Sequence, residues 1–347
     1  MLLMRPIALP AEKMKAAVLH GKGDLRIQTL NIPEISDNEV LIRVKAASMC
    51  GTDIHFYKGE METKKPRVLG HDFSGIVAKV GRDVKEFNEG DRVISEIIRY
   101  CGKCYHCSRG DHHLCVDAKY IGFEVDGSFS EYIAAPARNM FKIPDNVSFD
   151  EAAMTEPLAL ALHVMDFIQP KTRETIAIFG QGPVGLVQTQ VVKLSGMVVI
   201  AVETQPARLK LSEELGADYT INPNQADTRK SVLKITRGLG VDCSVEAAGL
   251  QETIDQAFEV TRSGGKLVLV GAGRNLRGPP LRHSEVTIWA PSNGGAGKYP
   301  LALKLVSEGK VNLRKLVTHR MPLHLLPRIM EDLSANRLEA IKVIIEP

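Results

Sequence analysis

Hydrophobic residues in the first part of the chain recur in short alternating runs. Gly, Pro, Asn or Asp separates these runs, which are KAAVLH (15–20), EVLIRVKAA (39–47), SGIVAKVG (74–81) and DRVISEII (91–98). Alternation with a period of two predicts β-strands, and the residues between them are typical of turns. The pattern therefore predicts an all-β, barrel-like region from Met14 to about Pro144.

The pattern changes from about Glu156 to Trp289, where nearly continuous apolar strands alternate with helical segments. The predicted strands are TIAIFG (175–180), VVIAVE (198–203), YTINP (219–223), VDCSVEAAG (241–249), GKLVLVG (265–271) and VTIWAP (286–291). Helical patterns lie between them, such as PVGLVQTQVVKLSG (183–196) and ARLKLSEELGA (207–217). Apolar strands joined by helices predict a parallel sheet that is covered on both faces.

These two patterns predict an α/β protein of two domains. The second domain, a doubly wound parallel sheet, is expected over residues 158–297. Residues 298–347 begin with a helix and end in the strand-like IKVIIEP, and a six-strand unit is already complete before them. We therefore expect the first domain to contain residues 1–157 and 298–347. A length of 347 residues, with 44% hydrophobic and 24% charged residues, fits a two-domain globular protein.

Charge and hydropathy exclude some partners. The chain has 44 Lys and Arg against 41 Asp and Glu, which is too balanced to favour nucleic acid or an anionic membrane as a partner. No run approaches the roughly 20 apolar residues of a membrane span. Arg5, Pro6 and Pro10 interrupt the apolar N-terminus, so no signal peptide is expected. Cytoplasmic location is the prediction.

A glycine turn marks a candidate nucleotide site. The strand 175–180 leads directly into Gly180-Gln181-Gly182-Pro183-Val184-Gly185, which opens a helix, and the next strand ends at Glu203. Side chains in this turn would hold the backbone away from a pyrophosphate resting on the helix N-terminus. Glu203 is expected to accept the ribose hydroxyls and to repel the extra phosphate of NADP, which favours NAD. Arg208 is expected either to line the adenosine ribose or to be a solvated arginine at a helix start.

Four of the six cysteines fall within fifteen residues. Cys101, Cys104, Cys107 and Cys115 supply four thiolates in one short loop. Four sulfur ligands with no open position are typical of a closed, structural zinc site. An iron–sulfur cluster, redox thiols or a nucleic-acid-binding zinc ribbon are weaker alternatives, because the loop lies inside a larger β domain and lacks a basic and aromatic surface.

Three further segments carry candidate catalytic chemistry: Cys50-Gly51-Thr52-Asp53-Ile54-His55, Gly70-His71-Asp72 and Thr155-Glu156-Pro157. Each has an ordinary structural explanation when taken alone. A lone cysteine is usually a small buried hydrophobe, and Glu156 could be a carboxylate favoured at a helix start.

Together these segments resemble the zinc-containing medium-chain dehydrogenase superfamily. The segment Gly70-His71-Asp72-x-x-Gly75-x5-Gly81-x-x-Val84 looks like the zinc motif of that superfamily, which usually has Glu where Asp72 stands. The cysteine loop and the glycine turn occur at matching distances. CGTDIHFY and KIPDNVSFDEAAMTEPLALALH look most like the sorbitol and polyol dehydrogenase branch. Dehydrogenases of threonine and of sugar phosphates share many of these features.

The resemblance implies a fold, two zinc ions and an NAD-linked reaction. The expected fold is a GroES-like β-barrel catalytic domain plus a Rossmann NAD-binding domain, and the expected assembly is a homodimer or homotetramer. Cys50 and His71 would bind the catalytic zinc, with Glu156 as a third ligand directly or through water. Zinc would act as a Lewis acid that helps a secondary alcohol of a polyol or sugar-like substrate to lose its proton, before hydride passes to NAD.

The resemblance also implies roles around the metal. Thr52 matches the hydroxyl that hydrogen-bonds the substrate oxygen, and His55 matches the outer end of a proton relay, for which imidazole is suited. Asp72 is one methylene shorter than the usual Glu, so we expect it either to support a zinc ligand from outside the metal shell or to form a structural salt bridge. Tyr57 is expected either at the substrate site or in ordinary packing.

Other functions remain open at this stage. The alternatives within the superfamily are a threonine dehydrogenase and a sugar-phosphate (alditol phosphate) dehydrogenase. A phosphate on the substrate would require a basic residue near the zinc, for which the candidates are Arg43, Arg274, Arg282 and Lys298. A zinc-independent reductase would lack the three ligand residues, all of which are present. The most distant alternative is a binding module, without enzymatic activity, that uses the cysteine loop.

Overall fold

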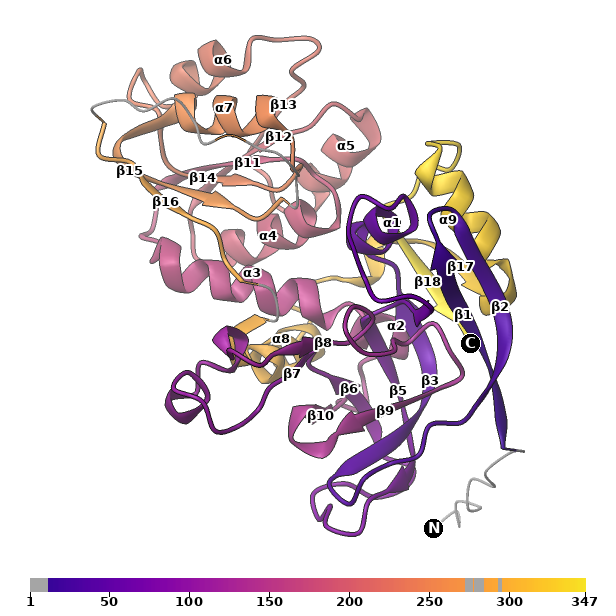
Figure 1. Cartoon of the computed structure of the whole chain (residues 1–347). Coiled ribbons are helices and arrows are strands. Elements are labelled where there is room, and N and C mark those ends of the chain that lie inside the picture. The colour runs from indigo at the N-terminus through magenta and orange to yellow at the C-terminus, as the bar shows by residue number, and fades with distance from the viewer. Residues whose placement is uncertain (1–11, 272–276, 278–283, 293–294) are drawn as a thin grey trace. The chain divides into compact units, whose positions relative to one another are not determined.

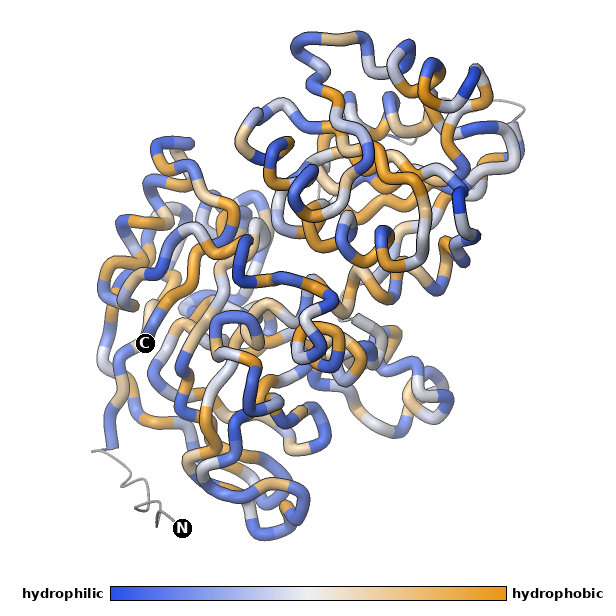
Figure 2. The backbone as a smooth tube through the Cα atoms, turned by 180° about the vertical axis from the view of Figure 1, so that it is seen from behind, coloured by the Kyte–Doolittle hydropathy of each residue, from blue (hydrophilic) through white to orange (hydrophobic). Residues whose placement is uncertain are grey.

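A computed structural model describes residues 12–271, 277, 284–292 and 295–347. The chain forms two compact units, of which unit 1 contains residues 1–156, 299–307 and 313–347, and unit 2 contains residues 157–298 and 308–312. Figure 2 shows hydrophobic residues gathered in the interior of each unit. No described helix combines the length and the apolar character needed to cross a membrane.

Unit 1 is built from β-sheets and a few short helices (Figure 1). Its strands are β1 (Lys13–Gly21), β2 (Asp24–Asn31), β3 (Glu39–Ser48), β4 (Arg67–Val68), β5 (Asp72–Val80), β6 (Arg92–Ser95), β7 (Ile98–Arg99), β8 (Lys119–Tyr120), β9 (Tyr132–Pro136), β10 (Met140–Lys142), β17 (Val317–Pro322) and β18 (Lys342–Glu346). Its helices are α1 (Gly51–Tyr57), α2 (Phe149–Ala152), α8 (Tyr299–Ser307) and α9 (Leu326–Ser334).

The main sheet of unit 1 runs in the order β10-β6-β5-β3-β18-β17, and β9 also pairs with β3. Strand β18 therefore lies inside the sheet, antiparallel to β3 and parallel to β17. The predicted alternation places fully buried residues such as Val40, Ile42 and Val77 in the core beneath this sheet. The C-terminal residues thus complete the sheet that carries the N-terminal motifs.

Unit 2 contains a six-stranded parallel sheet in the order β13-β12-β11-β14-β15-β16. Its strands are β11 (Thr175–Phe179), β12 (Val198–Val202), β13 (Tyr219–Ile221), β14 (Val241–Glu246), β15 (Thr261–Leu269) and β16 (Thr287–Trp289). Its helices are α4 (Pro183–Leu194), α5 (Pro206–Glu214), α6 (Thr228–Ile235), α7 (Gln251–Val260) and most of α3 (Thr155–Ile168). This order is that of a dinucleotide-binding Rossmann sheet. The predicted α/β fold class is confirmed.

Residues 308–312 group with unit 2 and divide the C-terminal part of unit 1. The side chain of Gln190 on α4 forms hydrogen bonds to this segment. Its Oε1 accepts a hydrogen bond from the backbone N–H of Asn312 at 2.7 Å, and its Nε2 donates to the Asn312 carbonyl at 3.4 Å. This paired contact holds the short segment against the Rossmann helix.

Candidate active site and cofactor site

A cavity of about 720 Å³ lies within unit 2 at the carboxyl end of its parallel strands. It is lined by residues that include Gly180, Gly182, Glu203, Arg208 and Thr253. Ligands bind at this end of parallel sheets because the loops that follow the strands meet there. The structure thus brings the first and second predicted glycines, the acid and the arginine around one cavity.

The three glycines of the turn meet different constraints. Gly180 has a φ of +89°, and a Cβ there would lie 3.0 Å from the backbone nitrogen of Ala248. A Cβ at Gly185 would lie 1.9 Å from the carbonyl oxygen of Gly180, so this glycine allows α4 to approach the strand. A Cβ at Gly182 would meet nothing closer than Arg208 Nη1 at 4.0 Å, and would occupy space on the cavity side. Pro183 follows at the first position of α4, where its missing N–H costs no hydrogen bond.

Glu203 is buried and organises the turn between β12 and α5. One carboxylate oxygen accepts a hydrogen bond from Gln181 N at 2.8 Å, and the other accepts from Thr204 N at 2.7 Å and Gln205 N at 3.0 Å. Arg208 Nη1 lies 3.9 Å from the first oxygen and lines the cavity. This position supports a role for Arg208 at a bound ligand over a solvated arginine at a helix start.

Sequence reasoning missed Glu246, a fully buried carboxylate at the end of β14. Its Oε1 accepts hydrogen bonds from Ala248 N at 2.8 Å, Gly249 N at 2.7 Å and Thr253 Oγ1 at 2.7 Å. Ala248 and Thr253 line the cavity, so Glu246 fixes the shape of this wall. The sequence did offer a signal for Glu246, because an acidic residue at the end of the apolar strand β14 is a candidate for the ligand side of a parallel sheet.

The four cysteines of the loop converge as predicted. Their sulfur atoms all lie within 4.8 Å of one another, with Cys101 Sγ to Cys107 Sγ at 3.9 Å and Cys104 Sγ to Cys115 Sγ at 4.0 Å. A Zn–S bond of about 2.3 Å in a tetrahedron gives sulfur separations of about 3.8 Å. The residues therefore fit a structural zinc ion.

Two thiols of the same loop have pKa values shifted in opposite directions. Backbone N–H groups of Cys107 and Val116 lower the pKa of the Cys104 thiol to about 6. Burial raises the pKa of the Cys107 thiol to about 12. A bound cation would stabilise all four thiolates, because zinc binds the deprotonated sulfur.

A second group of side chains gathers around Cys50, which caps the N-terminus of α1. The Cys50 thiol is within hydrogen-bonding reach of the His71 ring and lies 3.7 Å from Thr52 Oγ1. Asp53, which is fully buried, accepts hydrogen bonds from Cys50 N at 2.9 Å and Gly70 N at 3.2 Å. Asp53 Oδ1 also lies 3.6 Å from His71 Nδ1. One carboxylate therefore holds the two segments that carry Cys50 and His71.

Asp72 and Lys342 extend this group across the sheet. Asp72 Oδ1 lies 3.9 Å from His71 Nε2, and Asp72 Oδ2 lies 3.6 Å from Lys342 Nζ. The Lys342 ammonium also donates a hydrogen bond to the carbonyl of Met49 at 2.9 Å. All of these side chains are buried, and neither carboxylate oxygen of Asp72 has a hydrogen-bond partner among the described residues.

The electrostatics of this group favour a cation. Burial disfavours the protonated imidazole, yet the Asp72 and Asp53 carboxylates outweigh it and hold the pKa of His71 well above its usual value. Burial raises the pKa of Asp72, against the opposing effects of His71 and Lys342. Because Asp53 faces Nδ1, the second ring nitrogen of His71 remains for a metal, as in a carboxylate–histidine–metal arrangement. Cys50 and His71 thus fit two ligands of a zinc site.

Glu156 lies in the first turn of α3 and is partly buried. Burial first, and then the nearby charges of Glu156, Glu96 and Asp72, raise the pKa of the fully buried Tyr299 well above its usual value. The charges of both Glu156 and Asp72 therefore act on the Tyr299 hydroxyl. Among the described residues, the four-cysteine loop is the one set of His, Cys, Asp or Glu ligand atoms close enough together to hold a metal ion, and Cys50, His71 and Glu156 do not form such a set in this structure.

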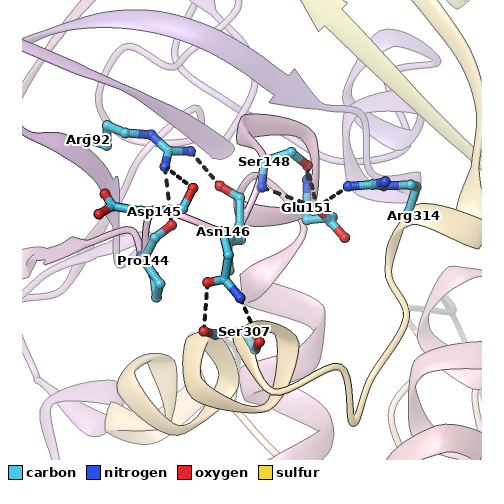
Figure 3. Close-up of polar contacts among 9 residues, drawn as sticks. Arg92, Pro144, Asp145, Asn146, Ser148, Glu151, Ser307 and Arg314 are labelled. Carbon is cyan, nitrogen blue, oxygen red and sulfur yellow. Dashed lines mark hydrogen bonds and ion pairs between the residues drawn. The ribbon is translucent and has the colours of Figure 1, made fainter.

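A hydrogen-bond network holds the segment that leads to Glu156 (Figure 3). Arg92 donates to the carbonyls of Pro144 and Asp145 at 3.2 and 3.1 Å. Asn146 and Ser307 exchange two hydrogen bonds of 2.8 Å, which join the segment to α8. Near the start of α2, Arg314 donates to Glu151 Oε2 at 3.2 Å. Residues far apart in the chain thus hold this segment in place.

The structure separates two aromatic residues by role. Tyr57 is 8% exposed and packs in the core cluster of unit 1, which supports ordinary packing for this residue. Phe123 instead faces the His71 ring, edge to face, with centroids 5.2 Å apart.

Of the basic candidates for a substrate phosphate, Lys298 pairs with Asp166 at 2.7 Å, while Arg274 and Arg282 lie outside the described residues.

Two family models match the chain. Residues 36–145 match the alcohol dehydrogenase GroES-like domain, and residues 183–308 match the zinc-binding dehydrogenase domain. The sorbitol dehydrogenase of Bacillus subtilis is 35% identical over 346 residues, which cover 97% of this chain and 98% of that protein. The chain belongs to the zinc-dependent alcohol dehydrogenase family. This zinc-dependent dehydrogenase uses zinc and a nicotinamide dinucleotide as cofactors.

Further relatives of this zinc-dependent dehydrogenase are named for other substrates. The D-arabitol-phosphate dehydrogenase of Enterococcus avium is 34% identical and covers 87% of this chain and 89% of that protein. The L-threonine 3-dehydrogenase of Bacillus velezensis is also 34% identical and covers 90% and 93%. A zinc-binding dehydrogenase of Sinorhizobium meliloti, whose structure is bound to NADP, has a TM-score of 0.91 at 30% identity and covers 97% of this chain and 100% of that chain. The predicted superfamily and enzyme class are confirmed.

Proposed function

We propose that this dehydrogenase oxidises a secondary alcohol of a polyol or sugar-like substrate with NAD, using a catalytic zinc held by Cys50, His71 and Glu156. The observation that carries the proposal is the buried group in which Cys50 and His71 meet two carboxylates whose charges favour a cation. Glu156 would be the third ligand, directly or through a water molecule. When bound there, zinc supplies a Lewis acid that eases loss of the substrate hydroxyl proton.

Residues of the protein would orient the substrate hydroxyl and carry its proton to solvent. Thr52, 3.7 Å from the Cys50 sulfur, would hydrogen-bond the substrate oxygen. His55, three residues after Thr52 on α1, would be the outer group of the relay to solvent. Asp53 would keep His71 oriented, and Asp72 with Lys342 would balance charge outside the metal shell.

The cavity in unit 2 would hold the dinucleotide. Its pyrophosphate would lie against the backbone at Gly180 and Gly182, where α4 begins. Glu203 would accept the ribose hydroxyls and disfavour an added 2′-phosphate, so NAD is the proposed cofactor. Arg208 would line the same ribose.

A substrate panel with a ligand variant tests the function. Polyols, sugars, hydroxy-amino acids and sugar phosphates are offered with NAD and with NADP while the nicotinamide absorbance is followed. The Cys50→Ser variant should lose activity and one of two bound zinc ions per chain, whereas Cys243→Ser, at a buried thiol of β14 in unit 2, should keep both. Turnover retained in Cys50→Ser would end the proposal. A clear preference for threonine or a sugar phosphate would select one of the family alternatives.

We further propose a cytoplasmic dimer or tetramer. None of the six cysteines, all of which are among the described residues, forms a disulfide bond, which fits a reducing compartment. Strand β16 ends the described sheet of unit 2, and an edge strand with unpaired backbone groups is a place where a second copy would pair. Light scattering of the purified chain would give the assembly state.

A further inference from the structure

The turn after α1 returns an acidic residue to His55. Glu60 N donates to the His55 carbonyl at 2.9 Å, and Met61 N donates to the same carbonyl at 3.2 Å. Gly59 has a φ of +69°, a left-handed conformation that favours glycine and reverses the chain within this turn. The backbone therefore places the Glu60 side chain beside the imidazole of His55.

The contact between the two side chains is short and uses a particular ring nitrogen. Glu60 Oε2 lies 2.6 Å from His55 Nδ1, and Glu60 Oε1 lies 3.1 Å from Lys58 Nζ. The hydrogen bonds to His55 and then to Lys58 lower the pKa of Glu60, so its carboxylate is ionised near neutrality. An ionised carboxylate can only accept hydrogen bonds, so Nδ1 must carry the hydrogen.

This arrangement decides which nitrogen of neutral His55 can take a proton. With hydrogen on Nδ1, the lone pair is on Nε2, for which no protein partner is found among the described residues. We propose that Glu60 is a positioning residue for the proposed relay, holding His55 in the Nδ1–H tautomer with Nε2 as the proton acceptor. This inference rests on the proposed function, because it assigns Glu60 a role through His55.

The proton step balances with the groups named. An O–H bond of the donor hydroxyl breaks and an Nε2–H bond forms, while Nδ1 keeps its own hydrogen bonded to Glu60. The resulting imidazolium has its positive charge next to the Glu60 carboxylate, and the Nε2 proton then passes to water. Glu60 neither gains nor loses a proton in this sequence.

Two measurements on Glu60→Ala test the assignment. Nitrogen NMR of the holoenzyme reports the tautomer directly, and we expect the Nδ1–H form of His55 in the wild type and its loss in Glu60→Ala. The kcat should fall about tenfold, a part of the roughly 100- to 10,000-fold that a general acid–base group supplies, with KM for both substrates unchanged. Glu62→Ala removes an exposed acid from the same turn and should change neither measurement.

A double-variant cycle separates positioning from a structural effect. In the His55→Gln background, Glu60→Ala should lower kcat by less than about twofold, because residues that act through one another are not additive. An equal loss in both backgrounds, or a wild-type His55 with hydrogen on Nε2, would overturn the inference. If the wild type oxidises no alcohol, the proposed function fails, while NMR still decides whether Glu60 sets the tautomer.

Discussion

At the scale of single residues, the glycine turn shows how two identical residues can serve different ends. Gly185 lies where a side chain would collide with the backbone at 1.9 Å, so its small size is needed for packing. Gly182 has open space on its cavity side, so its small size matters only when a ligand arrives. Folding and binding therefore make separate demands within one turn of four residues.

The two glycines can be tested as a matched pair. Gly182→Ala should leave the melting temperature within about 2 °C, while weakening NAD binding about tenfold or more, since the methyl group would take the place of the pyrophosphate. Gly185→Ala should destabilise unit 2 by about 1–3 kcal/mol, as overpacking does. Calorimetry and dinucleotide titration would measure both. Equal effects of the two variants on stability would contradict the assignment.

Lys342 provides a second residue-scale prediction. Lys342→Met removes the hydrogen bond to Met49 and the cation beside Asp72, leaving a buried carboxylate without that partner. The free energy of unfolding should fall by about 3–5 kcal/mol, the usual cost of breaking a buried ion pair. Urea titration at a fixed zinc concentration would measure it.

A compensating variant supplies the control for Lys342. Adding Asp72→Asn removes the second charge, so the double variant should recover at least half of the lost stability. A double variant as unstable as Lys342→Met alone would show that the ion pair is not the cause.

The residues that sequence reasoning found and missed differ in their separation along the chain. The glycine turn and the four cysteines could be predicted because their members are neighbours in sequence. Lys342 and Met49 are 293 positions apart, and only the completed sheet brings them together. The position of Tyr57 after a motif left two alternatives open, the substrate site and ordinary packing, and the structure places it in the core cluster of unit 1.

At the scale of elements, the hydrophobic pattern predicted where strands occur but not the residues at which they begin and end. The prediction GKLVLVG (265–271) corresponds to β15 (Thr261–Leu269), which begins four residues earlier through polar residues. A register shift between Val241 and Cys243 of β14 accompanies this early pairing. Backbone pairing with a neighbouring strand extended the element where side-chain polarity predicted a turn, since strand propensity depends on context.

The cysteine loop is an element whose structure depends on its metal. It contains little regular structure, and its residues Tyr105 and Leu114 are 70% and 44% exposed, so packing contributes little to its shape. We expect Cys107→Ser to bind one zinc ion per chain in place of two and to become sensitive to proteolysis between residues 101 and 115. Elemental analysis and limited proteolysis would show this. Retention of both ions would contradict the four-thiolate site.

At the scale of the whole molecule, polar contacts join distant parts of unit 1. Glu151 accepts hydrogen bonds from Ser148 and Arg314. Burial raises the pKa of Glu151, but its bonds to Ser148 and then to Arg314 outweigh burial and lower the pKa below its usual value of 4.5. A lowered pKa in the folded state means that this stabilisation is complete above pH 4.5 and is lost as the pH falls through the lower, folded value.

A pH series tests this contribution. At neutral pH the Glu151→Gln variant should melt below the wild type, and the difference should shrink as the pH falls below 4.5. Glu89→Gln, at an exposed acid of the same unit, should match the wild type throughout. A difference between Glu151→Gln and the wild type that is independent of pH would contradict the role of the ionised carboxylate.

The position of β18 inside the main sheet of unit 1 bears on biosynthesis. The strand follows the whole of unit 2 in chain order, yet it lies between β3 and β17 and brings Lys342 beside the residues proposed to bind the catalytic zinc. A nascent polypeptide that has emerged only as far as unit 2 would have folded the nucleotide-binding half while the other half still lacked an inner strand. Acquisition of the catalytic metal would then be a late event, after translation has passed residue 346.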